Sequence, residues 1–194
     1  MFISAIILAA GESKRMGQPK LLLKWGESSL FEQTMDNYLA SVVNEVNIVL
    51  GYEAAEIEKQ IGDRSVNIAV NPDYSKGMST SITIGINIMS PRTQGIMLAL
   101  ADQPSVTTHT IDRLIQVFGL KQKGIVLPVY QGQRGNPVIF DVKYREKLLS
   151  LEGDMGGREI VRSCYNDVQE VAVDNRGVLT DIDTPEDYNR HKPA

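Results

Sequence analysis

The sequence predicts an α/β protein built on a doubly wound, mainly parallel sheet. Short apolar runs alternate with stretches of helical spacing along most of the chain, which is typical of parallel strands joined by helices. The chain has 194 residues, of which 42% are hydrophobic, and it shows no linker, repeat or low-complexity tract. We therefore expect one domain over residues 1–194, long enough to bury a core without disulfides.

The first elements can be placed in chain order. An apolar run at 3–8 predicts a fully buried strand. Ser28 or Ser29 is a suitable N-cap for a helix that reaches about Leu39. The alternation then continues, with strands expected at 46–50, 66–70 and 95–100 and with helices at 53–61, 79–89 and 107–117.

The last third of the chain is less regular. Thr184 followed by Pro185 predicts the start of a helix, with Thr as the N-cap and Pro at the first helical position. Before it, strands are expected at 125–129, 137–140 and 168–173, and helices at 142–150 and 157–165.

Charge and cysteine content restrict the function. Lys and Arg number 20 against 24 Asp and Glu, a net charge of −4, so we expect neither a nucleic-acid nor a membrane partner. The single cysteine, Cys164, excludes an internal disulfide and a cysteine zinc cluster. The apolar start is too short for a membrane span and lacks a basic leader, so a cytoplasmic protein is expected.

The segment directly after the first strand is the first candidate for chemistry, because open α/β sheets bind ligands beyond the carboxyl ends of their strands. Its cations can hold a polyphosphate, although its spacing fits neither a Walker A loop nor a dinucleotide fingerprint. An ordinary glycine-containing turn with solvated charges is the alternative. The residues that let a ligand approach the backbone are Leu8, Ala9, Ala10 and Gly11, and the cations are Lys14, Arg15 and Lys20.

Two acidic segments are candidates for a metal site. Asp102 follows an apolar strand, and a carboxylate beside bound phosphates is an expected Mg²⁺ ligand. The alternative is an Asp that only ends a strand before a turn. In an extended 181–183 segment, Asp181 and Asp183 would point to one side and Ile182 into the core. Asp183 is then either a second metal ligand or a residue at a helix start.

Glycine and arginine meet in two further segments, 134–137 and 153–158, and this combination suits an anionic or planar polar ligand. Each segment alone could be a turn. Ser79 is either a helix cap or a contact to a nucleotide. There is no G-x-S-x-G, so a hydrolase elbow is not supported.

Together these segments resemble the molybdenum cofactor cytidylyltransferase family of nucleotidyltransferases over nearly the whole chain. Residues 8–20 look like the nucleotide loop, 102–104 like the metal-binding segment and 183–187 like the C-terminal signature. The segments 134–137 and 153–158 resemble R-G-H-P and G-D-x-G-A-R near the pterin side. Asn136 stands where that pattern usually has His, and Gly157 where it usually has Ala.

The resemblance implies a three-layer α/β/α, Rossmann-like fold of the glycosyltransferase-A-like kind. It implies transfer of CMP from CTP to the terminal phosphate of a molybdenum-loaded pterin, with release of pyrophosphate and with Mg²⁺ as cofactor. The methyl group of Ala10 is expected to favour CTP over GTP. The implied roles are nucleotide binding by Leu8, Ala9, Ala10, Gly11, Arg15, Lys20 and Ser79, catalysis by Arg15, Lys20 and Asp102, metal binding by Asp102 and Asp183, and acceptor binding by Arg134, Asn136, Asp154 and Arg158.

Three other functions compete with this hypothesis. The same chemistry could use GTP or another phosphorylated acceptor. An accessory protein could bind the cofactor and deliver it to a client such as a xanthine dehydrogenase, although Asp102 and Lys20 argue against pure binding. An NAD(P)-dependent reductase is disfavoured because the dinucleotide fingerprint is absent.

Overall fold

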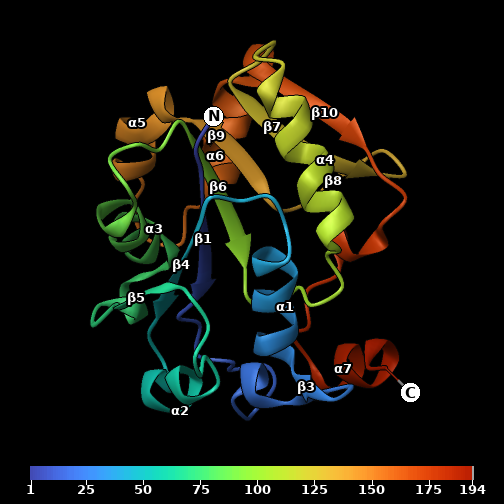
Figure 1. Cartoon of the computed structure of the whole chain (residues 1–194). Coiled ribbons are helices and arrows are strands. Elements are labelled where there is room, and N and C mark those ends of the chain that lie inside the picture. Colours follow the sequence, from blue (N-terminus) through green and yellow to red (C-terminus); the bar gives the residue numbers. More distant parts are fainter. Residues whose placement is uncertain (194) are drawn as a thin grey trace.

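The computed structural model describes residues 1–193, and most of its strands form one mixed sheet. The strand order is β10-β7-β9-β6-β1-β4-β5, with β8 paired to β7 (Figure 1). Only β9 and β8 run against the other strands, so the sheet is mainly parallel, as predicted. The strands are β1 (Ile3–Ala9), β4 (Glu45–Leu50), β5 (Asn67–Val70), β6 (Gly95–Leu100), β7 (Ile125–Tyr130), β8 (Gln133–Arg134), β9 (Val138–Asp141) and β10 (Val168–Ala172).

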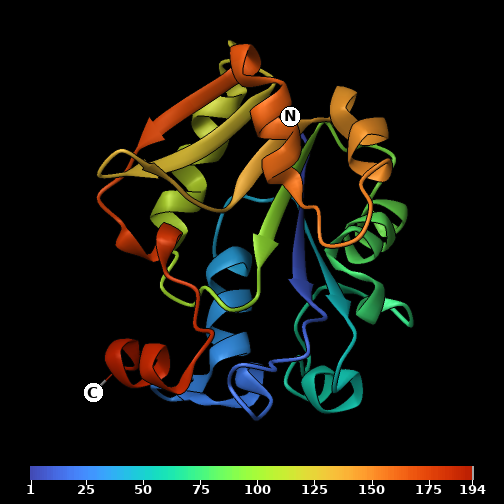
Figure 2. The ribbon, with the colours of Figure 1, turned by 180° about the vertical axis from the view of Figure 1, so that it is seen from behind.

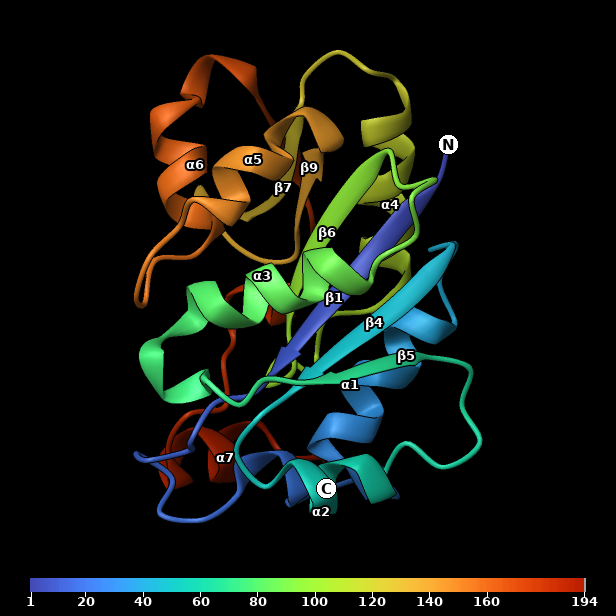
Figure 3. The same ribbon diagram turned by 90° about the vertical axis from the view of Figure 1, so that its left-hand side faces the viewer.

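Helices cover both faces of the sheet and complete the three predicted layers. Figure 3 shows α3, α5 and α6 in front of the sheet, with α1 and α4 behind it. No helix within residues 1–193 is long and apolar enough to cross a membrane. The helices are α1 (Leu30–Leu39), α2 (Ala54–Lys59), α3 (Met78–Ile88), α4 (Thr108–Gly119), α5 (Arg145–Leu149), α6 (Gly157–Ser163) and α7 (Pro185–His191).

The two faces of the sheet carry two separate hydrophobic cores. Because side chains alternate along a strand, Ile3, Ala5 and Ile7 of β1 pack into the core under α1 and α4. Ile6 faces the other way and packs with Ile82 and Ile86 of α3. The central strand is thus buried on both sides, as its continuous apolar run predicts.

Most of the predicted elements are confirmed, and the differences have local causes. Ser29 caps α1 in a capping box with Glu32, and Thr184 caps α7 in the same way. The helix expected at 142–150 begins instead as a 3-10 turn before α5. Sequence periodicity did not find the hairpin of β2 (Lys24–Trp25) and β3 (Ser28–Ser29), because two-residue strands show no period.

The sheet topology gathers the candidate residues at one edge. Leu8 at the end of β1 pairs in register with Leu100 at the end of β6. The loops that follow these two strands therefore begin side by side. Figure 2 shows α7 at this same end, next to the segment of the β2–β3 hairpin. The Tyr188 hydroxyl fastens α7 there by donating to the Lys24 carbonyl oxygen at 2.7 Å.

Helix α3 lies close to β1 because residue 85 is glycine. A Cβ atom at Gly85 would collide with Cγ2 of Ile6 and would approach Val49 to 3.3 Å. Ile6 is β-branched and fully buried, so it has little freedom to move aside. The position of α3, whose first turn borders the candidate site, therefore depends on this contact.

We predict that Gly85→Ala lowers the free energy of unfolding by about 1–3 kcal/mol, because the added methyl group overpacks the core. Urea denaturation followed by circular dichroism measures this change. Gly119→Ala is the matched control, since its Cβ would meet only Met1 Cε at 3.5 Å, an ordinary contact. Equal unfolding midpoints for the two variants would contradict the close packing of α3.

Candidate active site

Lys20 is the centre of the site. Its ammonium donates to Oδ2 of Asp102 at 2.5 Å and to Oδ1 of Asp183 at 2.6 Å. Arg15 donates from Nη2 to the other oxygen of Asp183 at 2.7 Å. Two cations and two carboxylates from three distant segments thus form one continuous charged cluster. Salt bridges of this kind are strong only where solvent is largely excluded.

The ion pair between Lys20 and Asp102 is largely buried, unlike a surface ion pair. The Lys20 side chain is 11% exposed and the Asp102 side chain 18%, whereas Arg15 is 71% exposed. Burial lowers the pKa of Lys20, but the two carboxylates outweigh this effect and hold the pKa above its usual value. Lys20 therefore stays charged at neutral pH, with its chain fixed by a bond from its backbone N–H to Ser13 Oγ at 3.2 Å.

One oxygen of Asp102 is left for another partner. Oδ1 of Asp102 is buried and accepts no hydrogen bond from any residue within 1–193. An unsatisfied buried carboxylate oxygen is costly, and it fits a site that receives a cation or a polar ligand group. No group of three or more His, Cys, Asp or Glu in the described chain converges as a metal cage. Asp102 and Asp183 are the two carboxylates at this position that could hold a divalent cation if phosphate and water supplied the remaining ligands.

The 181–183 segment places its side chains as the alternation predicts. Ile182 is fully buried, and its N–H donates to the Asp102 carbonyl oxygen at 3.0 Å. Asp181 accepts a bond from Nε2 of Gln103 at 2.6 Å, and burial, assisted by the charge of Asp102, raises the pKa of Asp181. Asp183 contacts the cations Lys20 and Arg15. Its carboxylate is therefore part of the charged cluster.

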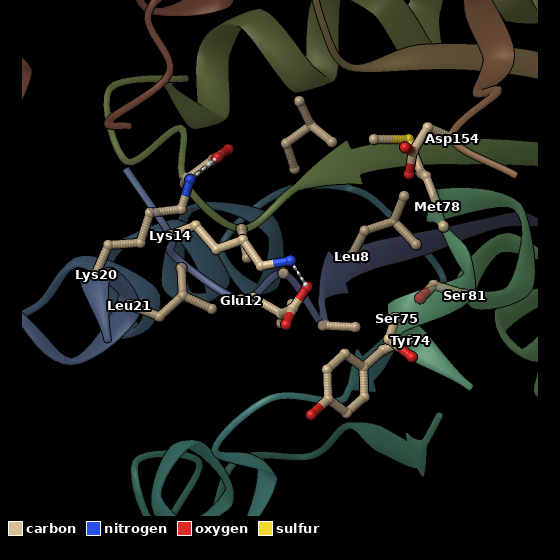
Figure 4. A pocket seen from close by; sticks show the side chains of 17 residues that line it. Leu8, Glu12, Lys14, Lys20, Leu21, Tyr74, Ser75, Met78, Ser81 and Asp154 are labelled. Carbon is tan, nitrogen blue, oxygen red and sulfur yellow. Dashed lines mark hydrogen bonds and ion pairs between the residues drawn. The ribbon is translucent and has the colours of Figure 1, made fainter. Parts of the chain in front are cut away.

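Two adjoining cavities open on this cluster. The first, which we call the loop cavity, has a volume of about 350 Å³ (Figure 4). In Figure 4, Lys20 and Lys14 lie on one side of it and Met78 and Asp154 on the other, with Tyr74 below. It is lined by Leu8, Ala9, Ala10, Gly11, Glu12, Lys14, Lys20, Leu21, Tyr74, Ser75, Gly77, Met78, Ser81, Leu100, Ala101, Asp102 and Asp154.

The second, which we call the sheet cavity, has a volume of about 600 Å³ and a mainly apolar floor. Leu98 of β6 and Val138 and Phe140 of β9 belong to this floor, together with Ile82 of α3. Its polar rim consists of Arg15, Asp102, Asn136, Asp154, Arg158, Glu159, Asp181 and Asp183. Leu8, Met78, Leu100, Asp102 and Asp154 line both cavities, so the two share a border at the charged cluster.

Most of the residues singled out in the sequence lie on one of these cavities. Two do not. The side chain of Ser79 is buried and lines neither cavity, and Arg134 on β8 pairs with Glu170 of β10 at 2.6 Å instead. Sequence reasoning missed Tyr74 and Ser75, which line the loop cavity, because their neighbours in sequence carry no recognisable motif.

Ser79 contributes through its backbone. Its N–H donates to the carbonyl oxygen of Gly153 at 3.0 Å, which anchors the 151–157 loop on the first turn of α3. Gly77 makes this contact possible, because a Cβ there would collide with the Gly153 backbone. The loop carries Asp154 to the border of both cavities.

The methyl group of Ala10 has a second neighbour besides the loop cavity. A Cβ on Gly51 would stand 2.7 Å from the Ala10 methyl carbon, and Ala10 is only 6% exposed. The methyl group therefore fills the space that Gly51 leaves. The preference for CTP over GTP that is expected of Ala10 therefore rests on a methyl group that packs partly beside Gly51.

A cleft of about 350 Å³ between a cationic loop and two carboxylates, on a Rossmann-like sheet, is typical of the nucleotidyltransferase class. The chain belongs to the family of the MobA-like NTP transferase domain, whose model matches residues 5–171. The matched region ends before Asp181 and Asp183.

Three named relatives have the same sequence identity to this chain, 29%. The molybdenum cofactor cytidylyltransferase of Escherichia coli K12 is 29% identical over 187 residues, 96% of this chain and 93% of that protein. The nicotine blue oxidoreductase of Paenarthrobacter nicotinovorans is 29% identical and covers 97% of this chain and 95% of its own. The purine catabolism protein PucB of Bacillus subtilis 168 is 29% identical and covers 100% and 97%.

A solved structure has the same fold over nearly the whole chain. Rv0371c of Mycobacterium tuberculosis H37Rv superposes with a TM-score of 0.90 at 31% identity, covering 98% of this chain and 96% of that one. A second crystal structure of Rv0371c was solved as a complex with manganese, and it matches with a TM-score of 0.85.

We predict that Gly77→Ala loosens the 151–157 loop, because the new methyl group displaces the Gly153 backbone from α3. Hydrogen exchange should become faster at Ser79 and across the loop, and stay unchanged in β1. Gly132→Ala is the control, since Gly132 also has a positive φ, +79°, but nothing within 4 Å of its Cβ position. Identical loop exchange in the two variants would refute the anchoring role of the contact.

Proposed function

We propose that this protein transfers CMP from CTP to the terminal phosphate of a molybdopterin-type acceptor and releases pyrophosphate. The observation that carries the proposal is the shared border of the two cavities at the charged cluster of Lys20, Asp102 and Asp183. A nucleotide in the loop cavity and an acceptor in the sheet cavity would meet there. The family and the similarity to the Escherichia coli cytidylyltransferase support this reaction.

In this reaction the protein mainly positions two anions, CTP and the phosphorylated acceptor, and neutralises their charge. An acceptor phosphate oxygen attacks the α-phosphorus of CTP, a new phosphorus–oxygen bond forms, and the bond to the leaving pyrophosphate breaks. Residues 8–11 would bring the backbone against the triphosphate, with Gly11 facing open space. Arg15 and Lys20 would balance the charge that develops on the leaving group.

A divalent cation fits the proposed role of Asp102 and Asp183. Mg²⁺ bound there would act as a Lewis acid on the phosphate oxygens. Asp102 would offer its unpartnered Oδ1, and Asp183 would offer the oxygens that now contact Lys20 and Arg15. The manganese complex of Rv0371c supports a divalent cation in a protein of this fold.

The sheet cavity suits the acceptor. Its apolar floor would accept a planar ring, while Asn136, Asp154 and Arg158 at the rim would hold polar and anionic groups. Gly157 leaves room for Phe140, because a Cβ at 157 would stand 2.8 Å from the Phe140 ring. Phe140 therefore occupies the volume that a methyl group at position 157 would take. The segment 134–137 contributes Asn136 to this proposal, whereas Arg134 is engaged by Glu170.

Two alternatives remain within the family. The oxidoreductase relative from Paenarthrobacter nicotinovorans means that the absence of G-x-G-x-x-G does not by itself exclude a reductase on this fold. The name of the Bacillus subtilis relative is compatible with a client molybdoenzyme such as a xanthine dehydrogenase, because xanthine is a purine. These alternatives differ in the ligand: a reductase would bind a dinucleotide, whereas an accessory protein for a molybdoenzyme would bind the cofactor and no free nucleotide.

The first test is calorimetric titration of the purified protein with CTP, GTP, UTP, ATP and NADPH, each with and without Mg²⁺. We expect CTP to bind about tenfold or more tightly than the other nucleotides, and only with Mg²⁺. Preference for GTP would show that the donor is GTP and the reaction guanylyl transfer, and preference for NADPH would support a reductase. No binding to any nucleotide would favour the accessory role.

Asp102→Asn should reduce Mg²⁺-dependent turnover by about a hundredfold or more, because the amide cannot replace the carboxylate as a metal ligand. The readout is pyrophosphate release, with circular dichroism to verify the fold. Asp63→Asn, at an exposed position remote from both cavities, is the charge-matched control. Near-normal turnover of Asp102→Asn would exclude the metal role.

Ala10→Gly should change the CTP to GTP preference by less than about tenfold, because the methyl group packs beside Gly51. The ratio of the two dissociation constants measures the effect. A complete switch to GTP would show that Ala10 alone selects the base.

A further inference from the structure

We infer that Lys20 is the resident cation of the metal site, and that the metal and the triphosphate must bind together because each depends on moving it. This inference rests on the proposed function, in which Asp102 and Asp183 hold a divalent cation. It adds a means of regulation: in the metal-free protein Lys20 blocks the metal position until a polyphosphate binds.

The geometry places the ammonium between the carboxylates. Nζ of Lys20 lies 2.5 Å from Asp102 and 2.6 Å from Asp183, so it bridges the two side chains. A divalent cation at this position would be held by the same two carboxylates, Asp102 and Asp183. The two cations cannot share this space, because their mutual repulsion in a poorly solvated pocket is large.

Lys20 borders a space into which its side chain can move. Its side chain lines the loop cavity, where the phosphates of a nucleotide would lie, and it is 11% exposed there. Moving Nζ toward a phosphate would free the Asp102 oxygen that it now occupies, beside the Oδ1 that has no partner. The triphosphate would thus attract the Lys20 ammonium away from the carboxylates and, in the same binding step, supply the remaining metal ligands.

Arg15 provides an internal comparison. It also contacts Asp183, at 2.7 Å, but it reaches the outer oxygen, is 71% exposed and touches no second carboxylate among residues 1–193. Arg15 therefore adds positive charge to the site without filling the space between the carboxylates. Removing each cation in turn separates occupancy of the metal position from its general electrostatic effect.

The experiment titrates the nucleotide-free protein with Mn²⁺ and measures free metal by electron paramagnetic resonance. We expect Lys20→Met to bind Mn²⁺ at least about tenfold more tightly than the wild type, because the competing ammonium is gone. Arg15→Met should gain about threefold or less. Lys59→Met, which removes an exposed lysine on α2, should equal the wild type.

Three results would overturn the inference. Mn²⁺ affinity of Lys20→Met could equal that of the wild type, it could fall, or Arg15→Met could gain as much as Lys20→Met. These measurements need neither CTP nor turnover. Failure here, with CTP-dependent turnover intact in the wild type, would refute the inference alone. Tight Mn²⁺ binding by Lys20→Met, together with a wild type that binds no CTP, would refute the proposed donor and leave the inference standing.

Discussion

The need to neutralise a buried lysine organises this molecule. Lys20 is nearly enclosed, and an unpaired ammonium in such a place would be strongly unfavourable. Its two partners are 82 and 163 residues away in sequence, on the loop after β6 and on the segment before α7. The order of the central strands, the path of the C-terminal segment and the capping of α7 all serve to bring these charges within 3 Å of one another.

The sheet topology places two cavities on either side of this charged cluster. Parallel pairing of β1 with β6 sets the loop cavity at their carboxyl ends. Antiparallel insertion of β9 beside β6 places Val138 and Phe140 next to it and builds the floor of the sheet cavity. One strand of reversed direction is therefore sufficient to give a nucleotide-sized cleft a second, apolar compartment.

Most of the strands and helices, and the loop after β1, could be predicted from the sequence, because they depend on local signals. The apolar runs, the caps at Ser29 and Thr184 and the loop after β1 are all encoded within a few residues. Contacts between distant segments could not be predicted in this way. Arg134 lies on β8, where it pairs with Glu170 and does not line the sheet cavity, and Ser79 acts through its amide, which sequence cannot reveal.

The separation of Lys20 from Asp183 also has a consequence for biosynthesis. A ribosome produces the chain from the N-terminus, so Lys20 emerges long before its second partner, 163 residues later. Until then Asp102, 82 residues after Lys20, is the only one of its two carboxylate partners that has been synthesised. The charged cluster is therefore completed only once the C-terminal segment has been made and has packed against the sheet.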